Sequence, residues 1–322
     1  MTQLMEKSYF GRGLHSKKWA TAFGKDGKLK RLIDEVLNDN DLVLQIREDY
    51  FNVYYKGGNL LRVSSENSFQ FDSNYYKCKS EYATDDERKE KRRQVLESLK
   101  KTRDYRAFIF EMKKLMDEYW IWLETETHRS ILEKNVQHAF CIGNTESNDY
   151  TIIDLEFQVS KICSYHYENP PRLSGRCIDE EKSSPRFDII AVRNCDHRLC
   201  VIELKTGVNA LQGKSGVGDH ADSFEGSIGR NAQTSEAFLK EMLKVVSDKK
   251  NLNILSEDFY IDEKAEPDFI YAYAFTSGDN ADKEKERKAL IEEINKNGCD
   301  KYKVIYLNKG EFSLSDSEIN VR

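Results

Sequence analysis

Residues 186–205 constrain the fold of this 322-residue chain more than any other segment. Two apolar runs, RFDIIAV and LCVIELK, flank the polar residues 194–197 and predict two strands joined as an antiparallel hairpin. An even loop pairs Asp188 with Glu203, and directly paired residues point to the same face. Because alternate residues of a strand share a face, Lys205 joins this pair. The same register pairs Ile190 with Val201, Val192 with Leu199, and Arg193 with Arg198.

The three charged side chains at this end of the hairpin suit phosphodiester chemistry. Two carboxylates at cross-strand distance repel each other unless a cation lies between them. Mg²⁺ favours carboxylate oxygens and keeps several waters and substrate phosphates as further ligands. A nearby lysine can orient the attacking water or stabilise charge on the phosphate. The alternative is a surface hairpin in which Lys205 only forms a salt bridge with Glu203 or Asp188.

At these residues the chain resembles the PD-(D/E)XK nuclease superfamily. The resemblance rests on RFDII, the fourteen residues between Asp188 and Glu203, and the intact ELK. It covers about residues 128–310 and implies an α/β (α+β) fold, a restriction-endonuclease-like mixed β-sheet flanked by helices. It also implies that Asp188 and Glu203 ligate Mg²⁺, with Mn²⁺ as a substitute, and that Lys205 is the catalytic lysine.

The resemblance implies two further site residues. The family places an acid on the helix before the first sheet strand, and Glu133 is our choice; its rivals are Glu124, Glu126 and Glu156. The family often has a glutamine on the helix after the lysine strand, and Gln233 is the candidate. One departure is that Phe187 precedes the first aspartate, with Pro185 displaced upstream.

A glycine-rich segment follows the lysine directly. Residues 207–229 hold six of the seventeen glycines, which favours a mobile loop that closes on substrate. Lys214 and His220 lie within it and are candidate substrate-binding residues. For His220 we consider a contact to phosphate or to a metal ligand, and the alternative is a plain surface histidine. The segment also resembles a phosphate-binding P-loop, but it has five residues instead of four before Gly213-Lys214-Ser215. We therefore set nucleotide hydrolysis aside.

Cysteine usage predicts a reducing compartment. The seven cysteines are scattered, and the N-terminus has no continuous apolar core typical of a signal peptide. The spacings Cys195-x-His197-x-x-Cys200 and Cys163-x-x-His166 raise the alternative of zinc, which requires four ligands at paired spacing. No apolar run reaches the length of a membrane span. The expected location is the cytoplasm.

The pattern of apolar residues along the sequence divides the chain into three parts. Residues 1–83 predict a small α+β module, residues 84–127 a helical connector, and residues 128–322 the nuclease-like domain. In the module we expect a helix at 29–37, strands at 42–47, 51–55, 60–63 and 68–71, and a turn at Lys56-Gly57-Gly58-Asn59. In the last part we expect strands at 150–159, 187–192, 199–205, 268–275 and 303–307, and helices at 232–246 and 283–294.

Charge is segregated along the chain. The net charge is −6, whereas residues 87–106 hold nine Lys or Arg against four acids, a local net charge of +5. Clustered basic residues are typical of phosphate contacts, which makes Arg92 and Arg93 candidate substrate-binding residues. The alternative is a solvated helix face with internal ion pairs.

These observations predict a Mg²⁺-dependent nuclease, and they favour DNA over RNA as its substrate and endonuclease action. A further interpretation is a prokaryotic defence or restriction-type effector whose N-terminal module holds the nuclease inactive until it is triggered. The alternative is a non-catalytic scaffold that binds nucleic acid or protein with the same core. We expect residues 1–83 to recognise substrate, bind a regulatory partner or mediate assembly. A homodimer would suit cleavage of both strands of a duplex, and no membrane partner is expected.

Overall fold

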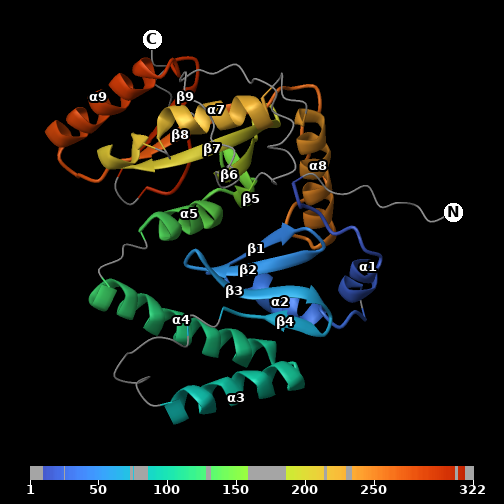
Figure 1. Cartoon of the computed structure of the whole chain (residues 1–322). Coiled ribbons are helices and arrows are strands. Elements are labelled where there is room, and N and C mark those ends of the chain that lie inside the picture. The colour runs from blue at the N-terminus through green and yellow to red at the C-terminus, as the bar shows by residue number, and fades with distance from the viewer. Residues whose placement is uncertain are drawn as a thin grey trace. The chain divides into compact units, whose positions relative to one another are not determined.

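The computed structural model describes residues 10–24, 26–72, 75, 86–127, 132–158, 186–213, 216–229, 234–308 and 311–315. It divides into two compact units (Figure 1). The five-stranded unit comprises Met1–Arg12, Gly143–Lys250 and Leu255–Arg322, and the four-stranded unit comprises Gly13–Ile142 and Asn251–Ile254. The division of the sequence into three parts at residues 83 and 127 stays a prediction.

The four-stranded unit is an antiparallel meander with helices before and after it. Its strands are β1 (Leu42–Arg47), β2 (Tyr50–Tyr55), β3 (Gly58–Ser65) and β4 (Ser68–Gln70), in the order β1-β2-β3-β4. Its helices are α1 (Lys18–Phe23), α2 (Lys30–Leu37), α3 (Asp86–Thr102), α4 (Tyr105–Thr127) and α5 (Leu132–Gly143). The predicted α+β character of this region is confirmed.

The turn between β2 and β3 follows from a glycine. Tyr55 pairs with Gly58, so that Lys56 and Gly57 form a two-residue turn. Both turn residues have positive φ, 46° and 74°, which is the conformation that twisted hairpins require and glycine adopts without strain. A side chain at Gly57 would also lie 2.4 Å from the Lys134 carbonyl oxygen. The predicted turn is therefore confirmed, with Gly58 already in the strand.

The five-stranded unit is a mixed sheet flanked by helices. Its strands are β5 (Tyr150–Gln158), β6 (Arg186–Arg193), β7 (Arg198–Thr206), β8 (Asp268–Ala274) and β9 (Lys303–Leu307), in that spatial order. Its helices are the 3₁₀-helix η2 (Val208–Ala210) and the α-helices α7 (Val217–Ser227), α8 (Ser235–Asn251) and α9 (Asn280–Lys296). The first three strands pair antiparallel, and β7, β8 and β9 pair parallel. This confirms a mixed α+β architecture.

The hairpin of β6 and β7 has the predicted register over its paired residues, which begin at Ile189 and Ile202; the predicted pair of Asp188 and Glu203 would be the next one and stays a prediction. Ile190 pairs with Val201, Val192 with Leu199, and Arg193 with Arg198. The four-residue loop is therefore even, as the argument about shared faces requires. All of β6 after Arg186 is buried, and β7 is buried from Leu199 to Lys205. Strands covered on both faces make near-continuous apolar runs, so the acids and the lysine within them stand out.

The glycine-rich segment differs from the expectation of a mobile loop. Residues 208–210 form η2 and Val217–Ser227 form α7. Buried apolar residues of α7, among them Val217, Ala221 and Phe224, pack in the core of this unit. Tertiary burial of this apolar stripe outweighs the low helix propensity of glycine. Across the parts of the chain that the structure describes, no helix has the length and apolar character needed to cross a membrane.

Candidate active site at the β6–β7 hairpin

Asp188 lies close to the backbone that carries the other two charged residues. It is the third residue of β6 and is 9% exposed. Its Oδ2 accepts a hydrogen bond of 2.8 Å from the backbone N–H of Leu204. Because Leu204 stands between Glu203 and Lys205 on β7, the Asp188 carboxylate lies at the strand segment where both are attached. The structure thus brings the predicted acids to the same end of the hairpin.

Glu203 and Lys205 lie on one face of β7, as alternation predicts. Lys205 Nζ donates to Glu203 Oε1 at 2.8 Å. Both side chains are nearly inaccessible, with side-chain exposures of 5% for the lysine and 3% for the glutamate. This contact is consistent with the salt-bridge alternative, but the burial is not that of a surface hairpin. Exposed ion pairs contribute little, whereas charges kept out of water require compensation from their surroundings.

His220 of α7 makes a second contact with the same glutamate oxygen. Its Nε2 lies 3.0 Å from Glu203 Oε1. A carboxylate oxygen accepts only, so the ring nitrogen is the donor in this contact. The sequence had placed His220 in a mobile loop as a substrate-binding residue. The structure instead places it on a helix beside the candidate metal ligand, and contact with substrate stays a prediction.

The two oxygens of the Glu203 carboxylate have different surroundings. Oε1 receives both donors, whereas Oε2 is buried and has no hydrogen-bond partner in the described part of the chain. Burial alone would raise the pKa of Glu203, but the charge of Lys205 and the contact with His220 outweigh it and hold the pKa below the ordinary value of 4.5. The carboxylate is therefore ionised at neutral pH, and its Oε2 lacks a hydrogen-bond partner among the described residues.

A hard divalent cation such as Mg²⁺ suits these carboxylate ligands better than a structural zinc ion does. The carboxylates of Glu203 and Asp188 are the ligand type that Mg²⁺ prefers, and Mg²⁺ needs only one or two protein carboxylates. Among the described residues, no group of three or more His, Cys, Asp or Glu side chains is placed to hold a metal. The zinc alternative gains no support from Cys195, His197 and Cys200, and its other pair, Cys163 and His166, lies outside the described residues.

The other predicted site residues are not brought to this hairpin by any described contact. Glu133 is the second residue of α5, a helix of the four-stranded unit, and its side chain is outside the described set. Gln233 and Lys214 also lie outside the described residues. Their roles stay predictions.

The rival acids occupy three positions on two elements. Glu124 is exposed on α4 of the four-stranded unit, and the side chain of Glu126 on the same helix is not described. Glu156 lies on β5, as predicted, with a positive φ of 45°. Its carboxylate lies 3.9 Å from the guanidinium of Arg186.

Arg92 and Arg93 of α3 both form ion pairs. Arg92 Nη1 donates to Glu118 Oε2 of α4 at 2.6 Å, and Arg93 Nε donates to Glu90 Oε2 of its own helix at 2.9 Å. The exposed Arg93–Glu90 pair is what the alternative of a solvated, ion-paired helix face expects, whereas the Arg92–Glu118 pair links two helices and is partly buried. A role of these arginines in substrate binding stays a prediction.

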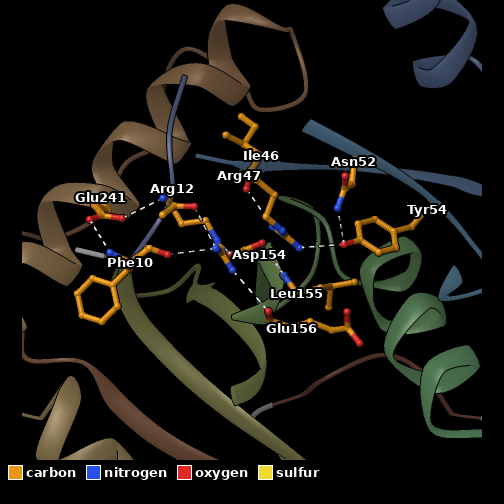
Figure 2. A network of polar contacts seen from close by, with 11 residues as sticks. Phe10, Arg12, Ile46, Arg47, Asn52, Tyr54, Asp154, Leu155, Glu156 and Glu241 are labelled. Atoms are coloured by element: carbon orange, nitrogen blue, oxygen red, sulfur yellow. Dashed lines mark hydrogen bonds and ion pairs between the residues drawn. The ribbon is translucent and has the colours of Figure 1, made fainter. Parts of the chain in front are cut away.

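A buried polar network that sequence reasoning missed ties residues 10–12 into the five-stranded unit (Figure 2). The backbone N–H groups of Phe10 and Arg12 donate to the two oxygens of Glu241, at 2.9 and 3.0 Å. Arg12 Nε donates to Asp154 Oδ2 at 2.5 Å, and Asp154 is fully buried. The Phe10 ring packs against Phe157 and Phe238, with centroids 5.4 and 5.9 Å apart.

One signal could have led to this network. Asp154 stands between Ile153 and Leu155 in the mostly apolar strand YTIIDLEF, and a buried carboxylate requires a cation or several donors. Its partner is 142 positions away in the sequence, so the local sequence pattern could not identify it.

Comparison of the chain with protein-family models, curated proteins and solved structures found no significant match. The site must therefore be judged by its own geometry.

Proposed function

We propose that this chain is a Mg²⁺-dependent nuclease that hydrolyses phosphodiester bonds in DNA, with Mn²⁺ able to replace Mg²⁺. The observation that carries the proposal is the placement of Asp188, Glu203 and Lys205 at one end of a buried hairpin, with one Glu203 oxygen that has no hydrogen-bond partner among the described residues. The mixed sheet around the hairpin and the resemblance in RFDII and ELK support it.

Each of the three residues has a distinct role in this proposal. Asp188 and Glu203 would hold the cation through their carboxylates. A bound Mg²⁺ would supply Lewis-acid polarisation of the phosphate and would lower the pKa of a coordinated water. Lys205, whose ammonium group is buried beside Glu203, stabilises the negative charge that develops on the phosphate oxygens as water attacks phosphorus. A buried ammonium group acts here more strongly than one in water, because the local dielectric constant is low.

Plasmid cleavage by the purified full chain tests the proposal. Supercoiled DNA should be nicked or linearised with Mg²⁺, and EDTA should abolish cleavage. Lys205→Ala should lose it, whereas Lys285→Ala should keep it, because that lysine is exposed on α9 and pairs only with its helix neighbour Asp282 among the contacts shown. Cleavage undiminished in Lys205→Ala would overturn the assignment. Binding of DNA without cleavage under these conditions would favour the scaffold alternative.

A defence role has a separate cellular test. Expression of the wild-type chain should slow growth of a bacterial host, and Lys205→Ala should be tolerated. An equal effect of both chains on growth would argue against a nuclease effector.

A separate assay distinguishes DNA from RNA as the substrate. The same protein preparations are tested on single-stranded RNA and on DNA of the same length, and the nucleic acid that is cleaved is the substrate.

A further inference from the structure

The start of α7, the helix that carries His220, is held by two contacts with other elements. At the first turn, Tyr271 of β8 donates its hydroxyl to the Val217 carbonyl oxygen at 2.8 Å. The next residue, Gly218, packs closely against Asn297: an added Cβ would lie 2.5 Å from Asn297 Oδ1. Asn297 is itself fixed, because its Nδ2 donates to the Glu293 carbonyl oxygen at 2.7 Å.

These contacts fix the position of His220 within the five-stranded unit. A strand and the end of α9 fix the start of α7, and His220 follows within one helical turn. Its side chain is only 17% exposed, and its Nε2 lies within hydrogen-bond distance of Glu203 Oε1. An exposed histidine on a free helix face would have neither constraint.

Lys205 and His220 both contact Oε1 of Glu203, and the two donors can have different roles. A lysine that acts on phosphate must turn its ammonium group toward substrate, and that motion would leave Glu203 Oε1 with one donor fewer. His220 is attached to a different element, so its hydrogen bond remains when Lys205 moves. The carboxylate then keeps the orientation in which Oε2 has no hydrogen-bond partner among the described residues.

We propose that His220 is a positioning residue that holds Glu203 in its metal-binding orientation while Lys205 turns toward substrate. This inference rests on the proposed nuclease function and deepens it. Hydrogen-bond partners of metal ligands typically contribute 10–100-fold to metal affinity or activity. The inference therefore predicts that loss of the His220 donor weakens metal binding, whereas loss of Lys205 impairs cleavage without weakening metal binding.

Calorimetric titration of the full chain with MnCl₂ tests this inference without substrate. His220→Leu, which fills similar space without a donor, should weaken Mn²⁺ binding by about 10-fold or more. His220→Gln, which keeps an N–H donor, should restore most of the affinity. Lys205→Ala should bind Mn²⁺ at least as tightly as wild type. The matched control is Ser223→Ala on the same helix, because Ser223 Oγ bonds to the Asp219 carbonyl oxygen of α7 itself, and its affinity should not change.

Gly218→Ala keeps His220 and disturbs the contact between Asn297 and the start of the helix that carries it. The added methyl group must displace Asn297 or α7, so Mn²⁺ affinity should fall while the histidine is intact. Thermal melts without metal show whether each variant is folded. Equal Mn²⁺ affinity in wild type and His220→Leu would overturn the positioning role but leave the nuclease proposal standing. Absence of Mn²⁺ and Mg²⁺ binding in the wild-type chain would instead overturn the nuclease proposal.

Discussion

The hairpin of the five-stranded unit and helix α3 of the four-stranded unit hold ion pairs of nearly equal length in opposite surroundings. Lys205 and Glu203 are 2.8 Å apart with side-chain exposures of 5% and 3%. Arg93 and Glu90 are 2.9 Å apart with exposures of 61% and 48%. Water screens the charges of the exposed pair. The charges of the buried pair are screened much less, so they act more strongly on any group that binds beside them. The difference teaches that burial, rather than distance or the number of charges, identifies the candidate site.

Neutralising one acid in each region should give the largest contrast. Glu203→Gln removes the charge of the buried carboxylate, so DNA cleavage should fall by at least about 100-fold. Glu90→Gln makes the same chemical change on α3 and should leave cleavage unchanged, because Glu90 meets only exposed neighbours of its own helix in the contacts shown. Initial rates of plasmid nicking measure both. Equal loss in the two variants would remove the contrast between the regions.

The second contrast concerns stability. Arg12→Met removes the guanidinium that bonds the fully buried Asp154, which should destabilise the five-stranded unit by about 3–5 kcal/mol. Arg93→Met on α3 should leave the unfolding midpoint within the scatter of repeat measurements, because its pair is exposed. Urea unfolding followed by circular dichroism measures both. A destabilised Arg93→Met with an unaffected Arg12→Met would show that burial does not set the value of these pairs.

A buried histidine extends the contrast to pH within the four-stranded unit. His138 of α5 lies 2.9 Å from the Asp41 carbonyl oxygen through Nε2, and burial lowers its pKa below the ordinary value of 6.5. Between the folded and the unfolded pKa the unfolded chain binds more protons, so stability falls as the pH decreases below about 6.5. The loss is at most about 1.4 kcal/mol for each pH unit.

Melting temperatures at pH 7.5 and pH 5.5 test this dependence. His138→Gln should show a smaller difference between the two pH values than wild type. His15→Gln is the matched control, since the side chain of His15 is exposed, and it should behave as wild type. A wild-type melting temperature that rises on acidification would contradict the direction of the pKa shift.

The smallest effect is expected from the basic face of α3. Arg93→Glu should change DNA affinity less than about twofold at physiological salt, because Arg93 pairs with Glu90 on its own helix. If this arginine instead contacts phosphate, the negative slope of log affinity against log salt should become less steep by about 0.9. Fluorescence anisotropy across a salt series separates the two alternatives.

Local pattern was sufficient for the hairpin and insufficient for what surrounds it. Strand alternation and an even loop predicted the register of β6 and β7 and the shared face of Glu203 and Lys205, because both are properties of neighbouring residues. The helix that carries His220 was missed, since its glycines suggest a loop when tertiary burial is not known. The partners of Glu241 at Phe10 and Arg12 lie more than two hundred residues away, beyond any local signal.

Locating a cation in the protein tests the central claim most directly. A crystal of the full chain soaked in MnCl₂ and measured at the manganese absorption edge should show an anomalous peak within coordination distance of the carboxylates of Asp188 and Glu203. A peak there would establish the metal site on which the proposed nuclease chemistry depends. Manganese peaks found only elsewhere, with both carboxylates ordered and the hairpin accessible to solvent, would contradict the account.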